Sequence, residues 1–181
     1  PLSTLPQTVS LIDNREWSSQ LSLSLDPIAA ISQLVPSFSP SRQKMTGFGE
    51  TFRGRSPLFM IDGIPQANPL RDGSRDGYTV DSAMVERVEI IHGASAAQGL
   101  GATGGIINFI TISPPSDDGF RNTLEIGSEF SDELESEGFG YYASAISGYR
   151  SGKLGYVVSA SYKWRPMAFD GDGNLVGIDN T

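Results

Sequence analysis

The chain has 181 residues, which allows one domain or one domain with part of another. Its formal net charge of −8 argues against a nucleic-acid partner, because such a partner would require a basic face. The lack of cysteine and the single histidine exclude disulfides, thiolate metal sites and clusters of imidazole ligands.

Two short elements are predicted within the first 36 residues. Residues 8–13 form an apolar, β-branched run that predicts a strand, and Asp13 or Asn14 is expected to cap a short helical turn at residues 15–18. Residues 26–36 predict a helix, because an aspartate cap and a proline at the first helical position begin it and a second proline ends it. Its apolar side chains recur at helical spacing and are expected in the core: Ile28, Ile31, Leu34 and Val35.

The middle of the chain predicts short strands separated by turns. Residues 37–48 are polar and predict a loop flanked by short strands. Residues 51–54 and 58–61 are expected to flank a tight turn at residues 55–57. An Asp-Gly pair at residues 62–63 gives a second turn signal.

The most distinctive stretch covers residues 85–112, where two apolar strands, predicted at 85–91 and 106–112, flank a glycine-rich segment. It follows a long polar loop at residues 65–78 and a helical turn predicted at 81–85. So many glycines cost conformational entropy, which a chain accepts where backbone must pack closely against something. The glycines are Gly93, Gly99, Gly101, Gly104 and Gly105.

Two segments of this stretch resemble motifs of cofactor-binding or catalytic sites. Residues 99–104 match the dinucleotide fingerprint G-x-G-x-x-G, but the fingerprint needs a helix after it and a β-branched segment follows at 105–111. Residues 93–97 resemble a nucleophile elbow, but the last glycine is missing and His92 precedes the serine, so the Ser…Asp…His order cannot be built. The sequence therefore favours a strand–loop–strand unit.

Residues 114–119 predict a linker, after which three long alternating segments follow. They exceed the usual length of about five or six residues and suit transmembrane strands of about 9–11 residues. A longer connection at 131–137 and a tight turn at 150–153 also match outer-membrane barrels. A soluble antiparallel sheet alternates too, so the strands alone leave both interpretations open. The alternating apolar side chains are Leu124, Ile126, Phe130, Phe139, Tyr141, Ala143, Ala145, Tyr149, Leu154, Tyr156, Val158, Ala160, Tyr162 and Trp164.

Five motifs, in order between residues 5 and 115, resemble the plug domain of TonB-dependent outer-membrane receptors. The most specific runs from ERVEI through the glycine-rich loop to GGIINFIT, at residues 86–111. The others are PQTVSLID at 6–13, the segment 28–36 ending in LVP, FRG at 52–54 and FMIDGIP at 59–65.

This resemblance implies an α+β plug domain at residues 1–115, a small mixed β-sheet with short helices. Residues 116–181 would then be the first antiparallel strands of a transmembrane β-barrel, which in this family has about 22 strands. Three strands cannot close, and an open edge is not tolerated in lipid. The chain is therefore expected to be a fragment whose leader lies outside it.

By the same resemblance, the whole protein would be an active transporter in the outer membrane of a Gram-negative bacterium, with a ferric siderophore as its ligand. The plug would lie in the barrel lumen, gate it and form part of the ligand site. An N-terminal TonB box, not recognisable in this chain, would bind the energy-transducing protein TonB. Cobalamin, haem or an oligosaccharide are the alternative ligands, and a soluble binding or adhesion module is the alternative of another class.

No catalytic constellation is visible in the sequence. The carboxylates of the loop regions are scattered among turn residues, which favours turn chemistry over paired acid–base groups. They are Asp62, Asp72, Asp76 and Asp81. We therefore expect no enzyme activity, no cofactor and no resident metal.

The resemblance places the ligand near outward loops at about residues 41–47, 54–57 and 66–72. Arginine forms directed hydrogen bonds to the oxygens of an anionic metal chelate, so the arginines of these loops are expected at the ligand. The expected ligand-binding residues are Arg42, Gln43, Leu70 and Arg71.

Family plugs are also held to the barrel wall by two arginines that pair with barrel glutamates, here called the lock. One lock position falls on Arg53, and the other on His92, where this chain departs from the family. A neutral imidazole would hold a glutamate less strongly near pH 7 and would gain charge below about pH 6.5.

Plug release is therefore expected to be easier in this protein, or sensitive to pH. A His92→Arg change in the full-length receptor should alter the pH profile of ligand uptake between about pH 5.5 and 8. An unchanged profile would contradict this expectation.

Overall fold

The computed structural model describes residues 8–23, 26–40, 47, 49–66, 76–93, 102–130 and 138–164. The chain divides into two compact units, Pro1–Ile112 (unit 1) and Ser113–Thr181 (unit 2). Compactness alone does not define where a domain ends in a longer protein, so the domain boundary expected after residue 115 remains a prediction.

Unit 1 is built on a five-stranded mixed sheet with the strand order β1-β6-β7-β4-β5. Strand β4 pairs with β7 in parallel, while the other neighbours are antiparallel. Strand β1 forms one edge and has only β6 beside it. The strands are β1 (Val9–Ile12), β4 (Pro57–Ile61), β5 (Ile64–Pro65), β6 (Val85–His92) and β7 (Gly105–Thr111).

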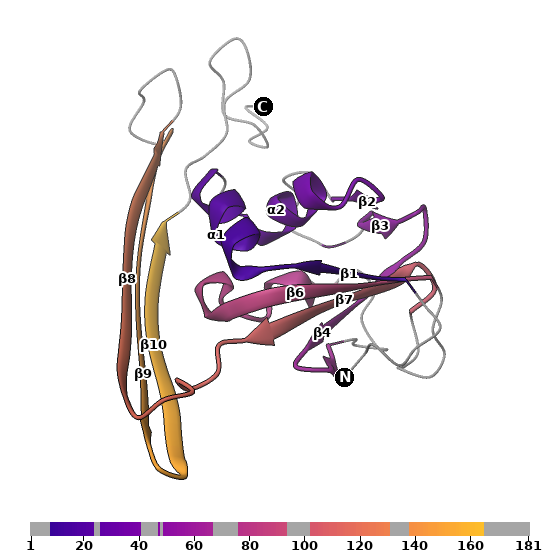
Figure 1. Cartoon of the computed structure of the whole chain (residues 1–181). Coiled ribbons are helices and arrows are strands. Elements are labelled where there is room, and N and C mark those ends of the chain that lie inside the picture. The colour runs from indigo at the N-terminus through magenta and orange to yellow at the C-terminus, as the bar shows by residue number, and fades with distance from the viewer. Residues whose placement is uncertain are drawn as a thin grey trace. The chain divides into compact units, whose positions relative to one another are not determined.

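Two helices, α1 (Asn14–Leu23) and α2 (Pro27–Leu34), lie over one face of this sheet (Figure 1). The core between them and the sheet is apolar and aromatic, and Phe109 of β7 contacts both the Trp17 ring and the Phe59 ring. Among the described residues, neither helix combines the length and the apolar character needed to cross a membrane. The α+β architecture expected from the sequence is confirmed. The core comprises Ile12, Trp17, Ile28, Ala30, Ile31, Val35, Phe38, Phe52, Phe59, Val85, Val88, Ile90, Ile107 and Phe109.

Helix α2 begins and ends as the sequence predicted. The Asp26 side chain accepts hydrogen bonds from the backbone N–H groups of Ile28 and Ala29, and Pro27 occupies the first turn. The helix ends before Pro36, and Ile28 and Ile31 are buried as expected. Local capping and apolar spacing were sufficient to define this element.

Helix α1 is ten residues long, so the expectation of only a short turn at residues 15–18 was wrong. Asp13 caps it as predicted: its side chain accepts from the Glu16 N–H at 2.9 Å, and Glu16 reaches back to the Asp13 N–H at 3.4 Å. The serine-rich sequence has weak helix propensity. Burial of Trp17 and its 3.2 Å hydrogen bond to the Ser82 carbonyl oxygen supply the tertiary support that extends the helix.

The first tight turn lies two residues earlier than predicted. Phe52 and Arg55 exchange backbone hydrogen bonds of 2.7 and 3.1 Å, so Arg53 and Gly54 form the turn, with φ angles of 53° and 75°. Two consecutive positive φ angles define a hairpin turn that few residues other than glycine adopt. Because arginine occupies the first of the two positions, the sequence did not indicate a turn there. The segment expected as a turn at residues 55–57 instead leads into β4. The predicted Asp62-Gly63 turn is confirmed, with φ angles of 50° and 81°.

The glycine-rich stretch joins two paired strands, as its sequence predicted. Strand β7 begins at Gly105, so a strand, not a helix, follows the G-x-G-x-x-G run. A Cβ atom on Gly104 would lie 2.6 Å from the Arg55 carbonyl oxygen and 2.7 Å from that of Phe52. Gly105 has a φ of 152°, and a Cβ there would meet the Ile91 carbonyl oxygen at 2.8 Å. Gly104 and Gly105 thus mark a close backbone approach between β7, β6 and the turn after β3 (Thr51–Phe52), whereas a Cβ on Gly93 would meet nothing within 4 Å.

Smaller elements complete unit 1. Strand β2 (Phe38–Ser39) pairs with β3 in a separate two-stranded ladder that flanks the polar loop. The 3₁₀ turns η2 (Asp76–Tyr78) and η3 (Ser82–Met84) precede β6. The η3 turn confirms the helical turn predicted at residues 81–85, and Asp81 caps it by accepting from the Ala83 N–H at 3.0 Å.

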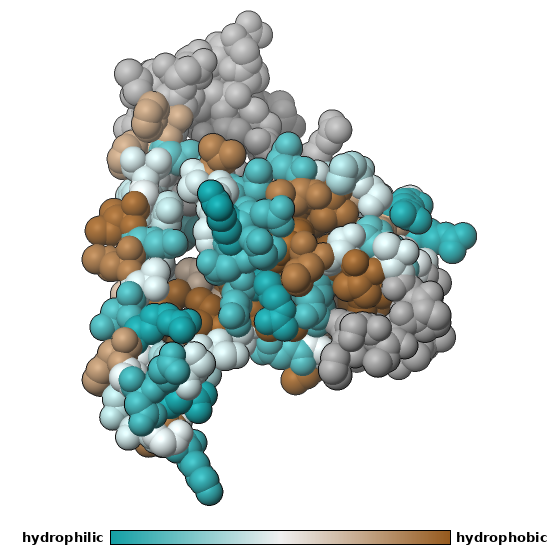
Figure 2. Space-filling view, in the orientation of Figure 1, coloured by the Kyte–Doolittle hydropathy of each residue, from teal (hydrophilic) through white to brown (hydrophobic). Residues whose placement is uncertain are grey.

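Unit 2 is a three-stranded antiparallel sheet in the order β10-β9-β8. Its strands, β8 (Gly119–Phe130), β9 (Phe139–Ser151) and β10 (Leu154–Trp164), are 12, 13 and 11 residues long, as the alternating pattern predicted. The pairing register puts most of the large apolar side chains of the three strands on one face, while Ile146 and Val157 lie on the other. Apart from the partly buried Tyr149, those on the first face are 42–76% exposed, and Figure 2 shows brown, hydrophobic surface along the strands.

The exposed face has a layered composition. An aromatic row, Phe120–Tyr149–Tyr156, crosses one end of the sheet with ring separations of 4.4 and 5.5 Å. A second aromatic cluster crosses the other end. Between the two lie aliphatic side chains and, next to the aromatic row, the polar pair Asn122 and Ser147, joined by a hydrogen bond of 2.8 Å. The second cluster contains Phe130, Phe139, Tyr141, Tyr162 and Trp164, and the aliphatic band contains Leu124, Ile126, Ala143, Ala145, Val158 and Ala160.

The linker is fixed to the other face of this sheet. Arg150 donates from Nε to the Pro115 carbonyl oxygen, and Asp118 accepts from the Gly152 N–H at 2.8 Å. Cβ atoms on Gly148 and Gly155 would lie 3.0 and 2.9 Å from the rings of Pro115 and Pro114. Glycines in β9 and β10 therefore admit the two proline rings, and the linker is an ordered part of unit 2.

Gly104 gives the sharpest test of the close backbone approach. Gly104→Ala should destabilise β6 and β7 by about 2 kcal/mol or more, because its Cβ would meet backbone oxygens that cannot move aside independently. Gly49→Ala is the control, since its Cβ meets nothing within 4 Å and only its φ of 98° is strained, at about 1 kcal/mol. Amide hydrogen exchange of β6 and β7 measures the difference; equal effects of the two changes would contradict the packing argument.

Candidate functional site

The described residues of the expected site meet at the end of strand β6. Of the six residues expected to act on ligand or barrel, Arg53 and His92 lie in the described chain. Phe52, next to Arg53, packs its ring against the imidazole of His92 with 5.4 Å between ring centroids. The four expected ligand-binding residues, Arg42, Gln43, Leu70 and Arg71, lie outside the described residues.

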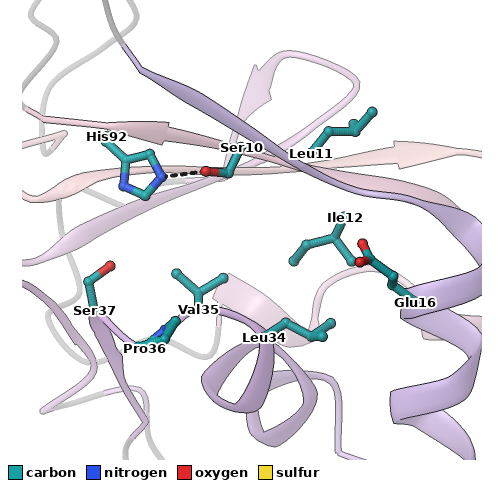
Figure 3. A pocket seen from close by; sticks show the side chains of 9 residues that line it. All are labelled: Ser10, Leu11, Ile12, Glu16, Leu34, Val35, Pro36, Ser37 and His92. Carbon is teal, nitrogen blue, oxygen red and sulfur yellow. Dashed lines mark hydrogen bonds between the residues drawn. The ribbon is translucent and has the colours of Figure 1, made fainter.

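His92 connects the end of β6 to the edge strand β1. Its backbone N–H donates to the Thr8 carbonyl oxygen at 3.0 Å, and its Nε2 lies 2.8 Å from the Ser10 hydroxyl oxygen. Figure 3 shows the ring turned toward β1, with this contact as a dashed line. Nδ1 is buried and has no hydrogen-bond partner among the described residues. His92 is therefore a partly buried side chain whose ring is engaged within unit 1.

Arg53 differs from His92, because its backbone is held in place while its side chain is exposed. Its backbone has the positive φ of the hairpin turn, and its N–H donates to the Ser37 carbonyl oxygen at 2.9 Å. The residue is exposed. A non-glycine residue at positive φ is uncommon and stores local strain that the surrounding hydrogen bonds must offset. The turn thereby fixes the backbone of Arg53 while leaving the guanidinium in solvent.

Burial lowers the pKa of His92 below its usual 6.5, and the positive charge of Arg53 lowers it further. A protonated ring would also place an N–H at Nδ1, where a buried donor would lack an acceptor. The neutral form with the proton on Nε2 avoids that cost, because this proton is donated to Ser10. Protonation, expected from the sequence near pH 6.5, is therefore moved to lower pH.

A hollow of about 220 Å³ opens beside the imidazole between β1, α1 and the end of α2. Its walls are mostly apolar, and Figure 3 shows Glu16 at the far end from His92. The described part of the chain contains no group of three or more His, Cys, Asp or Glu side chains that could hold a metal ion. The lining residues are Ser10, Leu11, Ile12, Glu16, Leu34, Val35, Pro36, Ser37 and His92.

The Ser10–His92 pair has the distance of a nucleophile and its base but lacks the rest of that machinery. A catalytic histidine needs a third group, usually a carboxylate, to orient the ring through its other nitrogen. Here that nitrogen, Nδ1, is buried and meets no partner in the part of the chain that the structure describes. Among those residues the Ser10–His92 pair is a structural connection between strands.

A second polar cluster, which the sequence analysis missed, ties β6, β7 and the β4–β5 hairpin together. The Glu89 carboxylate accepts from Arg87 through both Nε and Nη2 at 3.2 Å and from the Asn108 amide at 3.2 Å. Asn108 is 2% exposed and accepts from the Gly63 N–H at 2.9 Å. Asp62 completes the cluster by accepting from the Thr111 N–H at 2.9 Å and its hydroxyl at 2.7 Å.

This cluster accounts for most polar residues of the ERVEI, IDG and INFIT motifs: Arg87, Glu89, Asp62, Asn108 and Thr111. The signal was present in the sequence, because Glu89 and Asn108 interrupt strands that are otherwise apolar. Their pairing depends on the antiparallel register, in which these two residues are directly opposite. Buried polar groups need such partners, so the cluster fixes the register of three strands.

Comparison with known proteins places these features in context. The family model of the TonB-dependent receptor plug domain matches residues 1–106. The ferric aerobactin receptor of Klebsiella pneumoniae is 30% identical over 183 residues, covering 99% of this chain and 24% of the relative. The rhizobactin receptor of Rhizobium meliloti (strain 1021) is 29% identical over 181 residues, again covering 99% of this chain and 24% of the relative. The chain thus spans about a quarter of the length of these curated relatives.

Among solved structures, the ferric enterobactin receptor PfeA in complex with BCV-L6 is similar in fold. The superposition has a TM-score of 0.64 at 23% identity and covers 88% of this chain and 25% of the other. The shared fold includes both the mixed sheet with its helices and the antiparallel strands, because 88% coverage extends beyond unit 1.

The environment of His92 predicts how it titrates. Carbon-13 labelling of histidine in the full-length receptor, with His92→Gln to assign the signal, should give a midpoint below 6.5. Arg53→Gln should raise that midpoint, and Arg15→Gln on the exposed side of α1 should leave it unchanged. A midpoint at or above 6.5 in the parent protein would contradict the burial argument.

The same shift has a consequence for stability. Because the folded-state pKa of His92 lies below its unfolded value of about 6.5, the unfolded chain binds the proton more readily. The stability associated with neutral His92 is therefore fully present above about pH 6.5 and is lost as the pH falls from there toward the folded-state pKa.

Proposed function

Because the chain belongs to the family of TonB-dependent receptor plug domains, we propose that it is the plug and the first barrel strands of a siderophore receptor. The whole protein would take up a ferric siderophore across the outer membrane of a Gram-negative bacterium, driven by TonB. The observation that carries this proposal is the family match over residues 1–106 together with the five-stranded sheet of unit 1. Receptors for ferric aerobactin and for rhizobactin among the relatives support a siderophore as ligand.

The exposed face of unit 2 supports a membrane location for its strands. Ten residues separate Phe120 from Phe130, which corresponds to about 33 Å along a strand. A tilt of about 40° reduces this rise to about 25 Å, the height of the apolar band on an outer-membrane barrel. The two aromatic clusters would then lie at the two membrane interfaces, with the aliphatic band in the hydrocarbon.

The soluble alternative fits this face poorly. A soluble monomer rarely exposes an apolar patch larger than a few hundred Å². Here the exposed large apolar side chains of three long strands gather on one face, where lipid would cover them. Cobalamin, haem and an oligosaccharide remain the alternative ligands within the same class of receptor.

The ligand site proposed for the plug consists of Arg42, Gln43, Leu70 and Arg71 on its outward loops. A ferric siderophore is commonly anionic and carries carboxylate, hydroxamate or catecholate oxygens, and a guanidinium binds such oxygens through paired N–H groups. The plug would close the barrel lumen and release its ligand when TonB acts on the N-terminal box.

The lock to the barrel wall is proposed to depend mainly on Arg53. Its guanidinium is exposed on a rigid turn, so it is free to meet a barrel glutamate. His92 contributes less, because its Nε2 is engaged by Ser10 and its Nδ1 is buried. The lock between plug and barrel wall would then depend on one strong cation instead of two.

The proposal is tested with the full-length receptor as the sole siderophore receptor of an iron-limited host. The protein should fractionate with the outer membrane, migrate differently after heating, and support TonB-dependent uptake of a radioactive ferric siderophore. Arg42→Ala with Arg71→Ala should lower uptake at limiting ligand by about tenfold, as expected for two lost charge-assisted hydrogen bonds. Arg15→Ala, on the exposed surface of α1, is the matched control.

A soluble, detergent-independent monomer would refute the membrane location. Uptake of cobalamin or haem, but of no ferric siderophore, would refute the siderophore assignment while leaving the receptor class intact.

A further inference from the structure

We propose that His92 is a proton-operated latch for the edge strand β1: neutral His92 holds β1 on β6, and protonated His92 releases it. This inference deepens the proposed function and rests on it only for the meaning of the released segment. It differs from the lock, because the latch acts inside unit 1 and needs no barrel residue.

Strand β1 is one of the two edge strands of the sheet and has little support. It has four residues and, among the described strands, pairs only with β6. Val9, Ser10 and Leu11 are exposed, and Ile12 is its only buried residue. Ile12 also lies next to the Asp13 cap of α1, so the end near α1 is anchored while the end near Val9 is not. Any extra connection at the Val9 end therefore has a large effect on whether β1 stays paired.

His92 supplies that extra connection at the weak end. Its backbone N–H donates to Thr8, just before β1, and its ring contacts Ser10 within β1, at 3.0 and 2.8 Å. The Phe52 ring packs against the imidazole at 5.4 Å and limits its movement. Backbone and side chain of one residue thus bridge β6 to β1 on both sides of Val9.

Protonation cannot be accommodated in this arrangement. The added proton would reside on Nδ1, which is buried without an acceptor in the described structure. A buried ionic donor without a partner is costly, and the ring can relieve that cost only by turning to water. When the ring turns to water, its contact with Ser10 breaks, and the backbone hydrogen bond between His92 and Thr8 becomes exposed to solvent. The change in charge is thereby converted into a change in strand pairing.

The charged groups around the ring favour release over retention. Arg53, on the turn after β3, repels the imidazolium. Glu16, on α1, lines the same hollow but lies at its far end, and its Oε2 accepts from the Asp13 N–H at 3.4 Å (Figure 3). Apart from Glu16, the residues that line this hollow beside His92 have no titratable side chain: Ser10, Leu11 and Ile12 from β1, Leu34 at the end of α2, and Val35 to Ser37 after it. Gly105 on β7, paired with His92, has none either.

The released segment has a functional meaning if the proposed function is correct. In that case β1 directly follows the N-terminal part of the plug, on which TonB acts. Loosening β1 would lower the work needed to extend the plug from its N-terminal side. Acidic surroundings would then ease the energy-dependent step without any change at the ligand loops.

Amide hydrogen exchange of the full-length receptor in detergent, followed by mass spectrometry, tests the latch. Peptides covering β1 have the same sequence in the parent protein and in His92→Gln, so their intrinsic exchange chemistry is identical at each pH. At pH 5.0 the parent should exchange β1 at least about threefold faster, relative to His92→Gln, than it does at pH 7.5. Peptides from β8 to β10 should show no such change and serve as the internal control.

A parent-to-variant ratio for β1 that is the same at both pH values would overturn the latch. Arg53→Gln gives a second readout if His92→Gln fails to fold, because removing the repelling charge should move the onset of β1 exchange to higher pH. An unmoved onset would count against the latch too. These readouts involve no ligand, so a receptor that transports nothing yet opens β1 in acid would refute the proposed function and not the latch.

Discussion

The structure of unit 1 depends on one close approach of backbone, where Gly104 and Gly105 bring β7 against the turn after β3 and against β6. A side chain at either position would meet carbonyl oxygens at 2.6–2.8 Å. The approach allows β4 to pair with β7 in parallel from its first residue, Pro57 with Gly105. Parallel pairing requires a long crossover, and here the crossover contains β5, the polar loop and β6. The glycines therefore determine which distant segments become neighbours.

The two faces of the five-stranded sheet have different roles. One face is covered by α1 and α2 and buries the aromatic core around Phe109. The other carries the Glu89–Asn108 cluster and a smaller apolar group with Ile91 and Ile106. Packing on the first face gives stability, while the hydrogen-bond cluster specifies the register. A shift by one residue would leave the buried Asn108 amide and the partly buried Glu89 carboxylate unpaired.

Much of this fold was predictable because its signals are local. The cap at Asp26, the Asp-Gly turn at Gly63 and the alternation of β8 to β10 each depend on a few neighbouring residues, and each is confirmed. Helix α1 was underestimated because its support comes from Trp17 and Ser82, which lie 65 positions apart. The turn at Arg53 was misplaced because positive φ there is imposed by strand pairing rather than by glycine alone. The lowered pKa of His92 could not be predicted from the sequence either, because its causes are burial and the charge of Arg53 on the turn after β3.

Arg53 and His92 show how two positions with one expected role come to have different ones. The turn after β3 fixes the backbone of Arg53 and leaves its guanidinium in solvent, where a charge keeps its hydration at little cost. The end of β6 turns His92 inward against Phe52 and Ser10, where a charge would lose hydration and gain no acceptor. An arginine cannot discard its charge and would have to leave this inner position, whereas a histidine can occupy it as a neutral donor. An arginine at this position would present its charge to solvent, whereas His92 donates a hydrogen bond to β1. The charge state of His92 is therefore linked to the pairing of β1.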